Sequence, residues 1–530
     1  MMITMPSWES APELRHAPPS PGRFQPEHRS APRLTPELLA RLPRAVARPR
    51  FKVAALRTGI LHLGCGAFHR AHQAVMTQHA IEAEMTAGHL PPWGIVAASL
   101  RTGRLLPALR QQQGLYTVLE RGRQGLRAMV VGSVRETLHA QWEAARMQQV
   151  LLDPQLRLTT LTVTEQGYCA DPTTGRLDLE NDDVRNDLRR PWPRSVPGLL
   201  VRGLALRRAA GLPPPVLISC DNLAGNGRLL RQVCLDMAAL QDDSLADWIE
   251  RHVQFPSSVV DRIVPVSTHA DLHGAEALTG LVDAVPVSTE PFSQWVIEHF
   301  HGPRPLWEAA GAEFVDDVGP WQASKLRMLN GGHLALACLG LLAGCATVAE
   351  VMAEPPLSAY VQHLLLDEQR PTLPPSGHDT RAYAHRLIER WRNPRIAHQL
   401  ERVARNASAK LPTRLLAGLR CHLQNGRPAP WTVLAVAAWI WCASGHDAQG
   451  SVLLGADQLR DRLRRIGHEA GPDPARLVDG FMGLREVFGD DLPQDGQLVA
   501  GLRDAVRQLQ SRGALATARA ALNGELLACR

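Results

Sequence analysis

Lysine is scarce in this sequence. Of its 58 lysine and arginine residues, only Lys52, Lys325 and Lys410 are lysine. An arginine guanidinium stays protonated in proteins, whereas a buried lysine amine can lose its proton near neutral pH. The hypothesis that follows is that a lysine kept in such an arginine-rich chain does something that arginine cannot do.

Paired cysteines and long apolar runs are also missing. The nine cysteines are widely spaced and none forms a C-x-x-C pair, which predicts reduced and mostly buried thiols. No apolar stretch approaches the roughly 20 residues of a membrane span. The N-terminus lacks the apolar core of a secretory signal. We therefore expect a cytoplasmic protein with no membrane partner.

Positive charge is not concentrated anywhere along the chain. The net charge is +6, the basic residues are scattered, and few aromatic residues accompany them. This pattern argues against a nucleic-acid partner.

The chain divides into three parts. Residues 1–33 are rich in proline, serine and arginine, which predicts a disordered extension. Over residues 34–289, apolar strand-like runs alternate with helical patterns, as in a parallel sheet that binds ligands at its carboxyl edge. Helical periodicity dominates residues 290–530. The predicted fold class is an α/β domain followed by a mainly α-helical domain.

The stretch GCGAFHR follows an apolar run at 60–63 and opens a helical pattern. Glycines at such a turn let the backbone approach a pyrophosphate closely. His69 stands where the usual G-x-G-x-x-G motif has its third glycine, so an ordinary strand-to-helix turn is the competing interpretation. The candidate cofactor residues are Gly64, Gly66, Ala67, Phe68, His69 and Arg70.

The next predicted strand, at 93–100, ends without an acidic residue. An Asp or Glu there would bind the adenosine ribose of NAD, but this chain has Ser99 and Arg101. An arginine at this place can accommodate the 2′-phosphate of NADP. The residues themselves leave NAD and NADP both open, and Ser99 and Arg101 join the candidate cofactor residues.

Two common dehydrogenase chemistries lack their residues. None of the four tyrosines has a lysine four residues later, which excludes a Y-x-x-x-K catalytic pair. A zinc dehydrogenase needs cysteine and histidine ligands at suitable spacing, and Cys65 with His62 or His69 is a minor alternative of this kind. We expect no metal.

The stretch WQASKLRMLNGGH contains the second lysine. In a helix, Lys325, Asn330 and His333 would fall within an arc of about 140°, so all three can face one cleft. Burial would lower the pKa of the lysine and let it exchange a proton with an alcohol or ketone. The asparagine can donate to a developing alkoxide, and the histidine can orient a hydroxyl. The competing interpretation is a solvated lysine on an amphipathic helix.

Other polar residues follow predicted strands or helices. Asn222 lies just after a strand, where it either faces a ligand or forms an Asx turn. Asp261 and Arg262 lie within an apolar run and could form a structural ion pair. The residues that could hold a sugar-acid carboxylate, or end a solvated helix, are Arg402, Lys410 and Arg414.

Together these stretches resemble the long-chain polyol and hexuronate dehydrogenase family, which includes mannitol dehydrogenase. The resemblance runs in order from about residue 40 to the C-terminus and rests on HLGCGAFHRAHQA, LTVTEQGYCADPTTGRLDL, SCDN, FPSSVVDRIVP, EPFSQWVIE, KLRMLNGGH and KLPTRLL. Within the family the chain looks closest to the fructuronate reductase branch, through QQQGLYTVLE and GYCADPTTGRLDL.

The resemblance implies a Rossmann-like domain for NAD, a helical domain, and metal-free hydride transfer in the cleft between them. It implies that Lys325 is the acid–base group and that Asn222 and Asn330 stabilise the oxyanion. The further site residues implied by the resemblance are His333, Asp261, Arg402, Lys410 and Glu165.

The chain departs from the family pattern at three places. Gln322 replaces a glutamate that often stands three residues before the catalytic lysine, Gln166 replaces a lysine, and Asn-Ala-Ser at 406–408 replaces D-G-S. The first change bears on any proton relay to solvent, and the last on the binding of anions.

The resemblance leads us to expect reversible, nicotinamide-dependent reduction of D-fructuronate at C5 to D-mannonate. One alternative is a polyol dehydrogenase acting on mannitol and fructose or on arabinitol. Another is a non-catalytic NAD(P)-binding protein of the same fold. The expected partner is a small sugar acid or polyol, and the family leans toward monomers.

Overall fold

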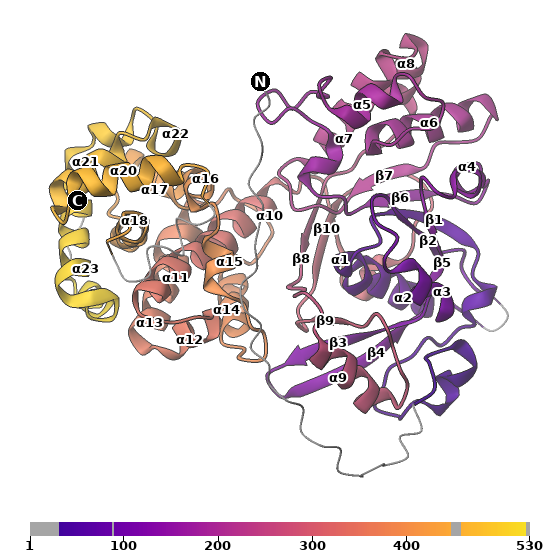
Figure 1. The fold of residues 1–530 in the computed structure, drawn as a ribbon, viewed down its shortest axis with the longest axis horizontal. Coiled ribbons are helices and arrows are strands. Elements are labelled where there is room, and N and C mark those ends of the chain that lie inside the picture. The colour runs from indigo at the N-terminus through magenta and orange to yellow at the C-terminus, as the bar shows by residue number, and fades with distance from the viewer. Residues whose placement is uncertain (1–30, 87–88, 447–456, 526–530) are drawn as a thin grey trace, which may run out of the picture.

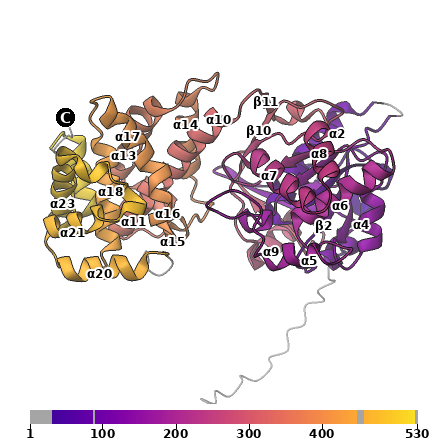
Figure 2. The ribbon, with the colours of Figure 1, turned by 90° about the horizontal axis from the view of Figure 1, so that it is seen from above.

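The computed structural model describes residues 31–86, 89–446 and 457–525. Figures 1 and 2 show two lobes lying side by side. The first lobe, indigo to magenta, contains the strands of the described chain, and the second lobe, orange to yellow, is helical. The predicted fold class, an α/β domain followed by a helical domain, is confirmed.

The central sheet of the first lobe has five parallel strands in the order β5-β2-β1-β6-β7. These strands are β5 (Val134–His139), β2 (Gly94–Ser99), β1 (Thr58–Leu63), β6 (Leu158–Leu161) and β7 (Val216–Ser219). The strand order reverses between β1 and β6. Open parallel sheets bind ligands beyond the carboxyl ends of their strands at such a reversal.

Helices cover both faces of this sheet, which explains why its strands are apolar without interruption. In β1, Leu61 and Leu63 pack into one core and Ile60 packs into the core on the opposite face. The α-helices of this lobe are α1 (Ala67–Ala71), α2 (Gln73–Glu84), α3 (Leu106–Gln111), α4 (Ala144–Leu151), α5 (Asp182–Asp187), α6 (Val196–Ala209), α7 (Asn226–Ala239), α8 (Asp243–His252) and α9 (His269–Thr279).

Two three-stranded sheets complete the first lobe on the side that faces the helical lobe (Figure 1). One contains β4 (Gly125–Val131), β3 (Tyr116–Gly122) and β9 (Val287–Thr289). The other contains β11 (Glu313–Val315), β10 (Gln294–Glu298) and β8 (Ser258–Asp261). The last residue of β8, Asp261, therefore lies at the border between the lobes.

The structure differs from the predicted change to helix at residue 290. Strands β10 and β11 lie beyond that point, where β10 hydrogen-bonds to β8 on one side and to β11 on the other, so the run of helices begins only at Gly319. Such short strands carry little pattern of their own, because their pairing partners are distant in sequence. Of the predicted extension at 1–33, residues 1–30 lie outside the described residues.

The helical lobe packs around α11 and α18, which are apolar on all sides and contact each other and α23. Its helices are α10 (Gly319–Ser324), the π-helix η5 (Lys325–Asn330), α11 (Gly331–Leu342), α12 (Val348–Ala353), α13 (Pro355–His363), the π-helix η6 (Leu364–Gln369), α14 (Thr380–Trp391), α15 (Leu400–Ala404), α16 (Ala407–Leu411), the π-helix η8 (Pro412–Leu416), α17 (Ala417–Gln424), α18 (Pro430–Ala443), α20 (Arg460–Ala470), α21 (Pro474–Met482), α22 (Arg485–Phe488) and α23 (Gly496–Leu522). None of the described helices combines the length and apolar character needed to cross a bilayer.

Candidate active site

Three adjoining hollows lie along the carboxyl edge of the central sheet. The glycine-turn cavity, about 560 Å³, shares Gly66 and Thr162 with the lysine cavity, about 720 Å³. The arginine recess, about 140 Å³, shares Asn222, Lys325 and Asn330 with the lysine cavity. The glycine-turn cavity lies within the first lobe, whereas both lobes line the other two. The two larger volumes are typical of small-molecule sites.

The glycine turn lies where the strand order reverses. Gly64 follows β1 with φ +103°, and a Cβ at this position would lie 2.0 Å from the carbonyl oxygen of Thr162 after β6. Only glycine fits such a close approach in this conformation. Gly66 precedes α1, and the nearest atom to its Cβ position is 3.8 Å away. The turn therefore presents bare backbone to the cavity, as a closely bound pyrophosphate requires.

The remaining residues of the predicted cofactor motif divide into two pairs. Ala67 and Phe68 line the lysine cavity. His69 and Arg70 are buried beneath the turn and line neither of the larger cavities. The His69 ring stacks on His62 with 3.5 Å between centroids, and burial lowers the pKa of His62 to about 3, so that ring is neutral. These two residues support the turn rather than face a ligand.

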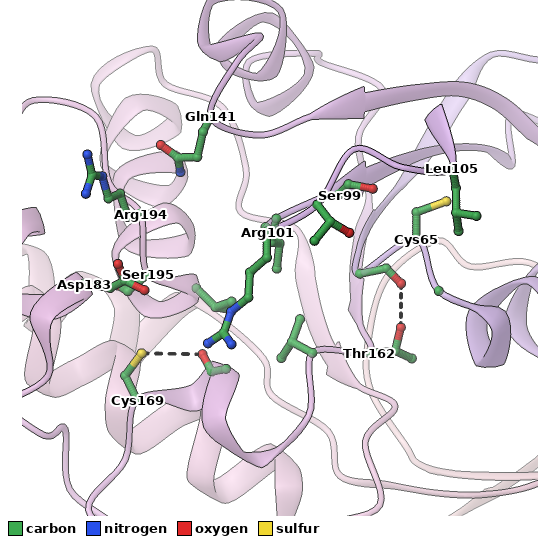
Figure 3. Close-up of a pocket in the computed structure, with 17 residues that line it drawn as sticks. Cys65, Ser99, Arg101, Leu105, Gln141, Thr162, Cys169, Asp183, Arg194 and Ser195 are labelled. Atoms are coloured by element: carbon green, nitrogen blue, oxygen red, sulfur yellow. Dashed lines mark hydrogen bonds between the residues drawn. The ribbon is translucent and has the colours of Figure 1, made fainter. Parts of the chain in front are cut away.

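Ser99 and Arg101 lie at the far end of the glycine-turn cavity, beyond β2. Figure 3 shows the Arg101 side chain reaching into the cavity, with Arg194 and Asp183 on the wall opposite. The acidic residue of this cavity thus comes from α5, not from the end of β2. Two arginines, Arg101 and Arg194, therefore line this part of the cavity together with Asp183.

Lys325 is the first residue of the π-helix η5 and is buried. Its Nζ donates to Asn222 Oδ1 at 2.6 Å and to the carbonyl oxygen of Val260 at 2.5 Å. Burial lowers the pKa of this amine to about 8, although the carboxylate of Asp261 acts in the opposite direction. The amine can therefore exchange a proton near neutral pH.

The other predicted catalytic residues meet the lysine in the same cavity. Asn222 Oδ1 accepts from the ammonium group, which leaves its Nδ2 to donate to a ligand. Asn330 ends the π-helix and lines both the cavity and the recess. His333 packs its ring against Trp391 and His398, and burial holds its pKa well below the usual range. His333 is therefore neutral and can either accept or donate a hydrogen bond.

Asp261 lines the lysine cavity and is fixed by a buried ion-pair network that joins the lobes. Arg390 of α14 donates to Asp261 Oδ2 at 2.6 Å and to Glu290 Oε1 at 2.7 Å. Burial alone would raise the pKa of Asp261, but the charges of Arg390 and then Lys325 hold it below its usual range. For Glu290, burial outweighs Arg390 and the pKa is raised.

Glu165 also lines the lysine cavity, on a turn that Asp221 holds in place. The Asp221 carboxylate accepts from the amides of Val163 and Thr164 at 3.0 and 2.9 Å and from the Tyr168 hydroxyl at 2.9 Å. Thr164 has φ +66°, which non-glycine residues rarely adopt. Strain of this kind persists where neighbouring contacts hold the backbone, as they do here.

Two predicted substrate residues lie apart from this assembly. Arg402 is exposed, and Lys410 Nζ donates to the carbonyl oxygen of Val403 at 3.1 Å; neither lines any of the three hollows. Gln322 lines the arginine recess, where its Oε1 accepts from the Gly225 amide at 3.3 Å. An amide at this position cannot ionise and so cannot relay a proton as a carboxyl group would.

Sequence reasoning missed Arg390, His398 and Asp221. Arg390 lies on a helix whose pattern looked simply amphipathic, and His398 lies in a short segment between helices. Asp221 adjoins Asn222, but its role depends on hydrogen bonds from the distant residues Val163, Thr164 and Tyr168, which the sequence does not show. Among the residues that the structure describes, no group of three His, Cys, Asp or Glu side chains is placed to hold a metal ion.

Comparison with known protein families gives two adjoining matches. Residues 58–309 match the mannitol dehydrogenase Rossmann domain, and residues 317–510 match the mannitol dehydrogenase C-terminal domain. The gap between these matches, residues 310–316, contains β11 and ends just before α10, where the structure changes from sheet to helix.

Individual relatives match over nearly their whole length. The chain is 42% identical to an uncharacterized oxidoreductase, YeiQ, of Escherichia coli K12, covering 89% of this chain and 96% of the relative. It is 41% identical to the D-mannonate oxidoreductase of the same organism, covering 88% and 96%. Among solved structures, Pseudomonas fluorescens mannitol 2-dehydrogenase in complex with NAD and D-mannitol superposes with a TM-score of 0.76 at 34% identity, covering 93% and 99%.

Proposed function

The chain belongs to the mannitol dehydrogenase family, and from this premise we propose that it interconverts D-fructuronate and D-mannonate with NAD as cofactor. The broader activity, oxidation or reduction at a CH–OH group of a sugar alcohol or sugar acid, follows from the family and from its similarity to D-mannonate oxidoreductase and mannitol 2-dehydrogenase. The choice of substrate is the step that goes beyond this similarity.

The residues at the glycine turn fit a dinucleotide. Gly64 and Gly66 leave the backbone of the turn without side chains at the point where the strand order reverses. The glycine-turn cavity continues from there past Ser99 and Arg101. We place NAD along this path, with its nicotinamide end toward Gly66 and Thr162, which also line the lysine cavity. Arg101 makes NADP the alternative cofactor. When bound, the cofactor supplies hydride transfer to or from the substrate carbon.

One observation carries the chemistry: a buried lysine whose pKa is lowered to about 8 donates to an asparagine beside the cofactor path. In the reduction, the Lys325 ammonium group gives its proton to the oxygen of the former ketone. Asn222 Nδ2 and the amide of Asn330 donate to the same oxygen as negative charge develops on it. In the oxidation, the neutral Lys325 amine removes the hydroxyl proton. We assign His333 to a neighbouring substrate hydroxyl.

The decisive test is an initial-rate assay of the purified chain. It combines D-fructuronate or D-fructose with NADH or NADPH and follows loss of the reduced cofactor. Fast turnover of D-fructuronate with NADH supports the proposal, and preference for fructose would place the chain with the polyol dehydrogenases. Cofactor binding without turnover of any ketose would favour a non-catalytic protein.

The same assay tests the role of the lysine. We expect Lys325→Ala to lower kcat by about 10²- to 10⁴-fold, the usual contribution of a general acid, while NADH still binds. A folded Lys325→Ala variant that retains the wild-type kcat would exclude this mechanism. Exposed Lys52, which lines none of the three hollows, provides the control Lys52→Ala, for which we expect no change.

A further inference from the structure

The arginine recess opens directly beside the groups that would hold the reacting oxygen. It shares Lys325, Asn222 and Asn330 with the lysine cavity, and its other wall includes Arg414. Arg414 belongs to the π-helix η8, whose backbone is pressed against the start of α11: a Cβ on Gly331 would lie 2.6 Å from the carbonyl oxygen of Arg414. The position of this arginine is thus fixed by the packing of two helices.

The charge of Arg414 is not neutralised by the protein. Within residues 31–86, 89–446 and 457–525, no carboxylate pairs with its guanidinium and no carbonyl oxygen accepts from it. The acid that lines the recess, Asp221, already accepts from two backbone amides and from Tyr168. Two buried arginines near the border between the lobes do have acidic partners. Arg390 pairs with Asp261, and Arg262 pairs with Glu120.

Arg414 is also close to the lysine cavity and partly removed from water. Burial lowers its pKa to about 10, and its positive charge contributes to the lowered pKa values of Lys325 and His333. An arginine that has lost water without gaining a partner is poorly stabilised, and a ligand carboxylate can supply the missing charge and two parallel hydrogen bonds.

We propose that Arg414 binds the carboxylate of the substrate, so that this active site takes sugar acids in preference to uncharged sugar alcohols. The inference rests on the proposed function and adds to it the residue that sets the substrate class. The recess has room for a terminal carboxylate, while the rest of the carbon chain extends past Lys325 into the lysine cavity. Lys410 and Arg402, which line none of the three hollows, are not needed for this contact.

Binding to the NAD complex of the full chain tests this directly. Dissociation constants for D-mannonate and for D-mannitol would be measured for the wild type and for Arg414→Gln, Arg414→Lys and Arg405→Gln. Arg405 is an exposed neighbour that lines none of the three hollows and serves as the matched control. D-Fructose 6-phosphate, with the NADH complex, distinguishes a carboxylate site from a phosphate site.

We expect the wild type and Arg405→Gln to bind D-mannonate more tightly than D-mannitol. Arg414→Gln should lose about ten- to a hundred-fold of that preference, the usual effect of hydrogen bonds to a charged group, and leave D-mannitol binding within about two-fold. Arg414→Lys keeps the charge but loses the bidentate geometry, so its preference should be intermediate.

Several results would overturn the inference. These are a wild type without preference for the acid, an Arg414→Gln variant that keeps the preference, and tighter Arg414-dependent binding of the sugar phosphate than of D-mannonate. A different result would show that only the proposed function is wrong. The preference for D-mannonate over D-mannitol would then depend on Arg414, but D-fructuronate would not be reduced. In that case another sugar acid is the substrate and the assignment of Arg414 stands.

Discussion

At the scale of single residues, the surroundings of Lys325 decide the pH at which each direction of the reaction runs. Alcohol oxidation needs the neutral amine, and ketone reduction needs the ammonium form. Because burial lowers the pKa of this amine to about 8, kcat/KM for oxidation should rise with pH and level off above about pH 8. For reduction it should be level below about pH 8 and fall above it.

Rate profiles in both directions, with one cofactor and one buffer series, check this prediction. Lys325→Arg is the informative variant, because an arginine cannot supply the neutral base. Its oxidation rate should stay low across the whole pH range instead of recovering at high pH. If the rates of oxidation and reduction by the wild type changed in the same direction as pH rises through 8, Lys325 would not be the group that exchanges the proton.

Residue types alone pointed to much of the site. The scarcity of lysine directed attention to Lys325, and the trio with Asn330 and His333 does line one cavity. The contacts that give the lysine its properties were not predictable, although Asn222 and Asp261 were among the predicted site residues. Val260 lies in β8 and Asn222 in the loop after β7, both far from the lysine in sequence. Arg390 has the sequence surroundings of any surface arginine on a helix, and only the structure shows its pairing with Asp261.

At the scale of elements, the site depends on a helix that is not α-helical. The predicted clustering of Lys325, Asn330 and His333 assumed regular α-helical spacing, but residues 325–330 form a π-helix. Helices of this kind occur often at functional sites. Sequence periodicity does not distinguish such a widened turn from a regular α-helix, and the π-helix packs against η8, a segment distant in sequence.

The contact between α11 and η8 leads to a prediction for Gly331→Ala. The added methyl group would lie 2.6 Å from the carbonyl oxygen of Arg414, and backbone must move to admit it. We expect a loss of about 1–3 kcal/mol in the free energy of unfolding, together with weaker binding of sugar acids as η8 is displaced.

Urea unfolding of the variant, with Gly496→Ala beside it, measures this effect. Gly496 begins α23 with nothing within 4 Å of its Cβ position, so alanine there should be neutral or slightly stabilising. A Gly331→Ala variant as stable as Gly496→Ala would mean that η8 moves aside freely. Arg414 would then not be held in place by this contact.

At the scale of the whole molecule, the order of the two lobes could be predicted, but not how they are joined. Alternating strands and helices followed by helices alone were enough for the fold class. The strands β10 and β11 were missed because each has only a few residues and pairs with distant segments. The contact between the lobes was not predictable for a similar reason, because its side chains come from β8, α14 and the loop after β9, which are distant in sequence.

Two arginines connect α14 to the first lobe in very different surroundings. Arg390 is 6% exposed and pairs with Asp261 and Glu290, which are 6% and 3% exposed. Arg123 pairs with Glu389, the residue before Arg390, and both members are 56% exposed. The two pairs therefore join the same parts of the molecule and differ in burial.

We expect Arg390→Met to lower the free energy of unfolding by about 3–5 kcal/mol, because it removes the guanidinium group that pairs with two buried carboxylates. Arg123→Met should cost no more than about 1 kcal/mol, as for other exposed pairs. In the wild type, Arg390 holds the pKa of Asp261 below its usual range. Without Arg390, burial would raise the pKa values of both Asp261 and Glu290, so the two carboxyl groups would take up protons in the folded variant more readily than in the unfolded chain.

The difference in free energy of unfolding between the wild type and Arg390→Met should therefore grow as pH rises from about 5 to 8. At lower pH the two carboxyl groups become protonated and the difference should shrink. Urea unfolding at several pH values, with Arg123→Met measured alongside, checks both the size and the direction of the effect. Equal stability losses in the two variants, or a deficit that shrinks with rising pH, would mean that the buried network does not hold the lobes together. The expected result would instead show that Arg390, through its pairs with Asp261 and Glu290, stabilises the attachment of the helical lobe, which carries Lys325, to the first lobe.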